Sequence, residues 1–546
     1  MVLRSKRISV MMVWALLQIC LFQSSRADEK ASETVPPSEQ QQQPSFDLWE
    51  LRVKGNTLLD NKQVEMTVYP FLGPGKDVNV VDQARAALEN LYHNKGYKTV
   101  AVDIPEQDVV NGVVYLQVTE GKVSRLRVKG SRYFSLGKIK KTIPELAEGS
   151  VPNLPKMQQQ LAELGRQSGD RKIIPIMRAG KTPGTLEVDL KVKDKLPLHG
   201  SVGINGRNSQ NTTRTRLVTN ISYDNLWQRF HSASFMFLTS PENNNEVEVF
   251  SGTYVLPVID NSTRLAMYVV SSSSNTNAIS QAGSGGANII GTGDIYGLRL
   301  IKAFPSSPAF IHSATLGVDY KSFSTDLPGV KKHVNYLPFS ARYNTQFRGS
   351  DYQAGLNLGV NFSLRGLINN DTAKFDSTHN DKGQRNGARP NYIYLTLDGN
   401  FNYRLPWEMA LQGRFAAQIA DSPLISYEQF FMGGATLVRG YFESQALADD
   451  GVMGSLELHS PRLAPNDWSF VNKLNGLVFF DAAKGWIKQA LPGQESSVSL
   501  YSAGVGMRFK LWRYMVGKLD WAWPLKANGD IQSGESRLHF NVAFEF

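Results

Sequence analysis

Cysteine and long hydrophobic runs are almost absent from this 546-residue sequence. The single cysteine, Cys20, lies within the first 27 residues, so the rest of the chain can contain neither a disulfide framework nor a thiol nucleophile. Beyond residue 27, no segment approaches the ~18 uninterrupted apolar residues of a membrane-spanning helix. Whatever holds this chain in a membrane must therefore be something other than a helix.

Signatures of catalysis are also missing. The 8 histidines show no metal-ligand spacing, and the glycine-rich stretch 283–286 does not fit a phosphate-binding loop. The sequence therefore predicts no enzyme, no cofactor and no resident metal. Net charge is only +10, and four of the basic residues lie before residue 28, so nucleic acid is not an expected partner.

The N-terminus is typical of an exported protein. Three basic residues precede an apolar run over residues 8–22, and small residues at positions 25 and 27 form a cleavage site. We expect a secretory signal peptide over residues 1–27. Residues 28–45 are rich in Glu, Ser, Pro and Gln, which predicts a flexible linker with no stable plug helix.

An internal repeat follows the linker. "LRVKG" occurs at residues 51–55 and again at 126–130, and in each copy the glycine closes a strand-like stretch. Two helical stretches and two β-runs follow each copy. We predict two β-α-α-β-β modules, module 1 over residues 46–120 and module 2 over residues 121–197.

The two modules differ in charge. Module 1 carries 7 basic and 11 acidic side chains, a net of −4, whereas module 2 carries 17 basic and 7 acidic, a net of +10. The basic surface of module 2 has two interpretations. It is either an ordinary solvated face, or a face that lies near an anionic membrane surface or binds an incoming chain.

From residue 198 to 546 the sequence alternates with a period of two. The run 352–364, for example, places apolar side chains on one face and Gln, Gly, Asn or Ser on the other. Strands with lipid outside and water inside have this pattern, and the length of the runs and their aromatic ends disfavour a soluble sandwich. Sixteen such runs are present, an even number, as a closed antiparallel barrel requires. The predicted fold is a transmembrane β-barrel of 16 antiparallel strands over residues 198–546, preceded by two α+β modules.

One connection carries an unusually specific motif. "GGATLVRGY" spans Gly433–Tyr441 in the connection 420–451, which strand parity makes the sixth outward loop. With two modules before the barrel and VRGY in loop six, the chain resembles two-partner secretion outer-membrane transporters. These form the haemolysin secretion/activation protein family, within the POTRA-plus-barrel superfamily.

The resemblance implies that loop six folds back into the barrel. There Arg439, Gly440 and Tyr441 would form a lock with Glu457, in "GSLELHSP", and Asp481, in "FFDAAKGW". A guanidinium presents a planar fork that can bind two carboxylates, and removing it would leave the two acids facing each other without a counter-ion. Ala483 departs from the family pattern, which usually has glycine there and a local bend in the strand.

The resemblance also implies a function. The modules would bind a large secreted exoprotein in the periplasm, and the barrel, in the outer membrane of a Gram-negative cell, would translocate it to the surface. Other expected partners are outer-membrane lipid and the barrel-assembly machinery, which would read the terminal aromatic Phe546; the chain is expected to be a monomer. Two alternatives are an outer-membrane protein insertase, which typically has more modules, and a passive porin, which needs none. The cargo stays open between a haemolysin, an adhesin and a haem-binding protein.

Overall fold

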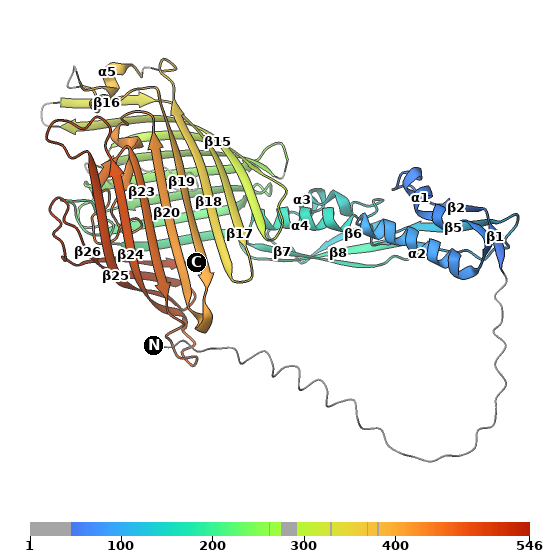
Figure 1. Cartoon of the computed structure of the whole chain (residues 1–546). Helices are drawn as coiled ribbons and strands as arrows, with labels where there is room; N and C mark the ends of the chain where they lie inside the picture. Colours follow the sequence, from blue (N-terminus) through green and yellow to red (C-terminus); the bar gives the residue numbers. More distant parts are fainter. Residues whose placement is uncertain (1–44, 261, 275–291, 328–329, 369, 379–381) are drawn as a thin grey trace, which may run out of the picture.

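The computed structural model describes residues 45–260, 262–274, 292–327, 330–368, 370–378 and 382–546. The expected signal peptide and the linker, apart from Ser45, lie outside these residues. The described chain consists of two small modules in a row, followed by a barrel (Figure 1). Among the described residues, no helix has both the length and the apolar character needed to cross a membrane.

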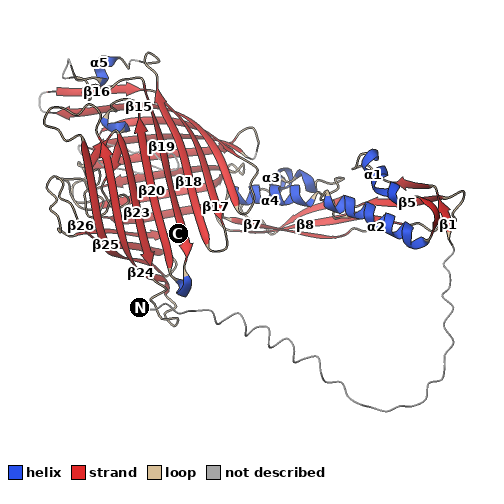
Figure 2. Ribbon diagram, in the orientation of Figure 1, coloured by secondary structure: helices blue, strands red, loops and turns tan. Residues whose placement is uncertain are grey.

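Module 1 contains a three-stranded sheet, a separate two-stranded sheet and two helices (Figure 2). Its elements are β1 (Phe46–Leu48), β2 (Glu50–Lys54), α1 (Asn61–Val68), β3 (Gly73–Lys76), α2 (Val78–Asn94), β4 (Val100–Asp103) and β5 (Val113–Glu120). Strand β5 is central, parallel to β2 and antiparallel to β4. Asp77 precedes helix α2, and its side chain accepts a hydrogen bond from the Val80 N–H. The helix buries Val81, Ala84 and Leu88 at helical spacing.

Module 2 repeats this arrangement, as the sequence repeat predicts. Its elements are β6 (Lys122–Lys129), α3 (Leu136–Thr142), α4 (Leu154–Gln167), β7 (Arg171–Ala179) and β8 (Thr185–Asp194), with β8 between β6 and β7. The glycines that end the two LRVKG copies allow the same close approach to the central strand. Gly55 and Gly130 have φ of +86° and +85°, and a Cβ there would lie 2.3 Å and 2.5 Å from carbonyl oxygens of the central strands. Only glycine fits that approach.

A buried carboxylate organises the sheet of module 2. Asp189 on β8 is 4% exposed and accepts hydrogen bonds from Lys129 (2.9 Å) and Arg127 (2.7 Å) on β6. The hydrogen bond from Lys129, followed by that from Arg127, holds the pKa of Asp189 below its usual value. The modules also contact each other, since Asn153 of module 2 donates to the Lys95 carbonyl at 2.9 Å.

The remaining strands close into an antiparallel barrel. They are β9 (Leu198–Asn205), β10 (Arg216–Leu226), β11 (His231–Thr239), β12 (Val247–Pro257), β13 (Thr263–Ser274), β14 (Thr292–Ala303), β15 (Phe310–Leu327), β16 (Val330–Tyr336), β17 (Pro338–Arg348), β18 (Tyr352–Ser363), β19 (Tyr392–Arg404), β20 (Ala410–Ala420), β23 (Asp450–His459), β24 (Val471–Trp486), β25 (Ser497–Leu511), β26 (Met515–Pro524) and β27 (Arg537–Glu545). Segments β16 and β17 both pair with β15, so they form one broken strand. The barrel has sixteen strands, and the predicted fold class is confirmed.

The period-two pattern sets which side chains point outward and which point into the barrel. On β23, Val452 and Leu456 are each 47% exposed on the outer surface, whereas Ser455 and Glu457 are buried inside. Strand β27 pairs with β9 to close the cylinder, and Phe546 exchanges two backbone hydrogen bonds with Gly200 (3.0 and 3.1 Å). The last residue of the sequence therefore completes the seam.

Module 2 is joined to the barrel by a side chain from the turn between the second and third barrel strands. Phe230, between β10 and β11, packs into the core of module 2, where it is 8% exposed. The guanidinium of Arg171 lies 4.0 Å from its ring centroid, and Asn225 donates to the Tyr133 carbonyl at 2.8 Å. These contacts hold module 2 against the end of the barrel at which this turn lies.

Candidate functional site

Loop six, residues 421–449 between β20 and β23, folds into the barrel. Its ends form a short antiparallel ladder between β21 (Phe430–Met432) and β22 (Ala446–Ala448). Between these strands the chain reverses inside the lumen, where the segment 433–445 contacts inward side chains of β20, β24 and β27. The motif that is unusual in the sequence therefore lies in the interior of the molecule.

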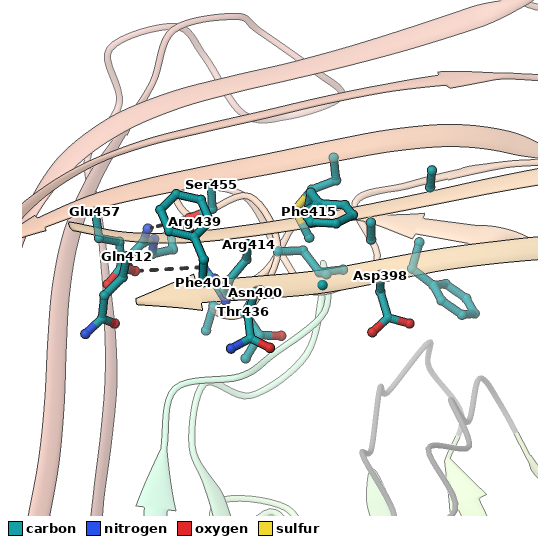
Figure 3. Close-up of a pocket in the computed structure, with 18 of the residues that line it drawn as sticks. Asp398, Asn400, Phe401, Gln412, Arg414, Phe415, Thr436, Arg439, Ser455 and Glu457 are labelled. Atoms are coloured by element: carbon teal, nitrogen blue, oxygen red, sulfur yellow. Dashed lines mark hydrogen bonds and ion pairs between the residues drawn. The ribbon is translucent and has the colours of Figure 1, made fainter. Parts of the chain in front are cut away.

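Arg439 is 1% exposed and meets both acids named from the sequence. Its Nε and Nη2 donate to the two carboxylate oxygens of Asp481 at 2.7 and 2.8 Å, and its backbone N–H donates to the same carboxylate at 3.1 Å. Nη1 lies 2.8 Å from Glu457. Figure 3 shows Arg439 beside Glu457 and Ser455. The structure thus brings the three charged residues of the expected lock together.

Strand register explains why one side chain reaches so many partners. On the facing strands β23 and β24, Ser455 is opposite Asp481 and Glu457 is opposite Phe479. The guanidinium lies over this group of four, 3.4 Å from the Phe479 ring centroid. The buried guanidinium of Arg439 therefore takes part in ion pairs, hydrogen bonds and a cation–π contact at the same time. The pairing of β24 with both neighbouring strands continues without a bulge through Ala483, the position that departs from the family pattern.

Gly440 and Tyr441 are held as closely as the arginine. Gly440 has φ +92°, its N–H donates to His539 at 2.8 Å, and a Cβ there would lie 3.1 Å from the Pro524 ring. Left-handed backbone and close approach together favour glycine. Tyr441 is fully buried, and its hydroxyl lies 2.7 Å from the Lys526 carbonyl.

Sequence reasoning missed several members of the network. Asp520 lies 3.4 Å from Arg439 and 2.8 Å from Arg508. Glu457 is also 3.8 Å from Arg508 and 3.9 Å from Arg414. The expectation that losing Arg439 would leave both acids without a counter-ion is therefore wrong for Glu457; for Asp481, Arg439 is the one ion-pair partner within 4 Å among the described residues. Alternation along β26 places Asp520 on the inner face, but no motif singles it out.

A second buried cluster fills the outer end of the lumen. Glu428 of loop six is 4% exposed and accepts hydrogen bonds from Tyr336 (2.7 Å), Tyr394 (2.6 Å) and Lys321 (2.6 Å). Tyr427 stacks on Phe323 with 4.1 Å between ring centroids. The further apolar members are Val247, Val249, Tyr268, Val270, Ile295, Val334, Phe375, Ala388, Tyr392, Ala420, Leu424, Ile425 and Phe431. We call this group the outer cluster; there the inner faces are apolar, contrary to the expectation of water inside every strand.

A cluster of two aspartates and one histidine lies outside the lock, and these residue types can bind metal ions. Asp170, His199 and Asp224 approach one another where module 2 meets the barrel. His199 Nε2 is 2.8 Å from Asp170, and Lys195 Nζ is 3.2 Å from the other oxygen of the same carboxylate. Because a lysine and a histidine already face Asp170, this group is an ion-pair network at the junction.

Comparisons with known proteins agree with this architecture. Residues 46–121 match the POTRA domain of ShlB type, and residues 184–509 match the family described as haemolysin secretion/activation protein ShlB/FhaC/HecB. The outer membrane transporter CdiB of Dickeya dadantii (strain 3937) is 23% identical, over 92% of this chain and 87% of its own length. The heme/hemopexin transporter protein HuxB of Haemophilus influenzae (strain 86-028NP) is 22% identical, over 80% and 76%. A solved structure of CdiB from Escherichia coli superposes with a TM-score of 0.69 at 19% identity, over 94% of this chain and 93% of that one.

Proposed function

Because this chain belongs to the haemolysin secretion/activation family of two-partner secretion transporters, we propose that Arg439 and its acidic partners hold loop six inside the barrel until an exoprotein crosses. The protein is an outer-membrane transporter that secretes a partner exoprotein, and its POTRA region lies in the periplasm. The burial of Arg439, at 1% exposure between Asp481 and Glu457, carries the proposal. Moving Arg439 away from these two carboxylates would leave buried charges without their partners, which costs free energy. The loop therefore has two states, one docked against the carboxylates and one released from them.

The modules offer an extended chain a place to bind. In each sheet the central strand is paired on both sides, which leaves β2 and β4 of module 1 and β6 and β7 of module 2 as edges. An exported segment can add to such an edge through backbone hydrogen bonds, with little dependence on its side chains. Module 2, which is fixed to the barrel through Phe230, then delivers the segment to the lumen.

The further partners follow from the barrel surface. Outer-membrane lipid contacts the exposed apolar face of the strands. A single chain closes its own seam between β27 and β9, which supports a monomer. Phe546, 68% exposed at that seam, is the aromatic that the barrel-assembly machinery would read.

The test compares secreted proteins in the source strain. We expect deletion of the gene to remove one large exoprotein from the culture medium, and wild-type protein to restore it. Arg439→Ala should fail to restore it although the heat-modifiable barrel is present, whereas Arg365→Ala, an exposed arginine in another outer loop, should restore it fully. Unchanged secreted proteins in the deletion strain would instead favour a passive porin, and loss of many outer-membrane barrels would favour an insertase.

A further inference from the structure

Loop six leaves one wall of the lumen uncovered. Its inner segment is fixed to the C-terminal strands: Arg439 to Asp481 on β24, and Gly440 to His539 on β27. Glu443 adds a pair of 3.2 Å hydrogen bonds from Arg207, just after β9. These attachments place most of the segment on the side of β23–β27 and β9. It also touches β20, where Arg414 donates to the Thr436 carbonyl at 2.6 Å, so the wall formed by β18, β19 and the first residues of β20 faces open space.

That open space is a cavity of about 980 Å³. Thr436 and Arg439 of loop six line one side, and Asn400, Asn402 and Gln412 line the other. Figure 3 shows Asp398, Asn400 and Gln412 along the strands at this cavity. A second cavity of about 480 Å³ lies at the periplasmic ends of β18–β20, and it shares Gln353 and Asn402 with the first. Together the cavities run from the periplasmic rim into the lumen.

The uncovered wall is rich in side-chain amides. We call Gln353 and Asn357 of β18, Asn400 and Asn402 of β19, and Gln412 of β20 the amide track. Strand register places Gln353 beside Asn402 and Asn402 beside Gln412, and places Asn357 beside Asp398. Asp398 is the single charged residue on the inner faces of β18 and β19 between the rim and the outer cluster, and it accepts a 2.7 Å hydrogen bond from Asn357.

Most of these amides make no side-chain hydrogen bond within the part of the chain that the structure describes. Among the described residues, the side chains of Gln353, Asn400, Asn402 and Gln412 have no hydrogen-bond partner, and the first three are exposed. The opposite wall is different, because its arginines and carboxylates are paired with one another. The track therefore offers uncharged donors and acceptors that other side chains do not occupy, and the charged side chains nearest to it along the strands are Asp398 and Arg414, which is opposite Asn400 in register.

We propose that the amide track is the surface along which the exported polypeptide crosses the barrel as an extended, unfolded chain. This inference rests on the proposed function and names the path of its substrate. Inward-facing residues of one strand recur about every 6.6–6.8 Å, which is also the two-residue repeat of an extended chain. Asn402, Asn400 and Asp398 on β19 thus match a chain that lies along the strand.

Amides suit this task because each supplies both a donor and an acceptor. They can bind the backbone of any sequence, and uncharged contacts hold neither acidic nor basic segments in place. Passage through a pore requires contacts that are weak and repeated, so that the moving chain can leave each one. The track ends at Tyr394 of the outer cluster, whose hydroxyl binds Glu428 of loop six, so exit requires that cluster to open.

The experiment uses site-specific photocrosslinking in intact cells. Benzoylphenylalanine replaces Asn400, Asn402 or, as a matched control, Asn541, an asparagine that lines the same cavity from β27. The probe is the exoprotein identified by the secretion comparison, fused to a disulfide-closed domain that stalls it in transit. We expect crosslinked exoprotein at positions 400 and 402 and a several-fold weaker product at position 541.

The outcomes separate the two proposals. Equal or stronger crosslinking at position 541, or no crosslinking at any of the three positions while wild-type protein secretes, would overturn the track. Failure of wild-type protein to secrete any exoprotein would instead overturn the proposed function. As a second measurement, we expect the double variant Asn400→Leu, Asn402→Leu to slow secretion several-fold with an unchanged amount of folded barrel, and Asn541→Leu to secrete normally. Normal secretion by the double variant would also count against the track.

Discussion

Replacing Arg439 with alanine tests the role of loop six directly. The change removes both side-chain hydrogen bonds to Asp481 and the contact with Glu457. It leaves Asp481, which is 0% exposed, without an ion pair within 4 Å among the described residues. Breaking a buried ion pair by removing one side costs about 3–5 kcal/mol. Since about 1.4 kcal/mol is a factor of ten, the ratio of docked to released loop should fall roughly a hundred- to several-thousand-fold.

Hydrogen exchange of the purified, full-length protein measures this ratio. The amides of Arg439 and Gly440 both donate to barrel side chains, so their protection reports docking. We expect Arg439→Ala to lower that protection by the same hundred- to several-thousand-fold. Arg439→Lys should restore little of it, because one ammonium cannot reproduce the planar fork.

Substitutions of the two acidic partners of Arg439 should differ in how strongly they weaken docking of loop six. Asp481→Asn should weaken docking more than Glu457→Gln, because Arg439 is the cation hydrogen-bonded to Asp481, whereas Glu457 also lies near Arg508 and Arg414. Adding either change to Arg439→Ala should have little further effect. Unchanged protection in Arg439→Ala, or losses that simply add in the double variants, would refute the lock.

Three other predictions concern the modules and the seam. Phe230→Ala should cost module 2 about 3–5 kcal/mol and reduce secretion, whereas Trp227→Ala, a change at an exposed side chain of the same turn, should not; hydrogen exchange of module 2 in the full-length protein compares them. Deleting Phe546 removes a backbone pair at the seam, so less folded barrel should reach the outer membrane, and an unchanged heat-modifiable band would contradict this. The lowered pKa of Asp189, caused first by Lys129, stabilises module 2 at neutral pH, and this stabilisation should disappear as the pH falls through the lowered pKa. Asp189→Asn should flatten that acid-side loss of exchange protection in module 2; a profile identical to wild type would show that the pair does not matter.

The sequence alone determined the architecture because periodic patterns are local. A period of two assigns each strand residue to lipid or lumen, so sixteen strands and their faces can be read without coordinates. The LRVKG repeat located both modules, since each needs a glycine where a carbonyl of the central strand approaches. Arg439, Glu457 and Asp481 were found because they lie in short motifs of a known family.

Only the tertiary structure decided which inward-facing residues lie at the same level along the barrel axis and on the same side of the lumen. Alternation places Asp520 and His539 inside, but only strand register brings them level with loop six. Glu428 lies in a loop without periodicity, and its three partners come from strands far away in sequence. The amide track exists because loop six lies against the opposite wall, and no local pattern states on which side of a closed cylinder a loop will pack.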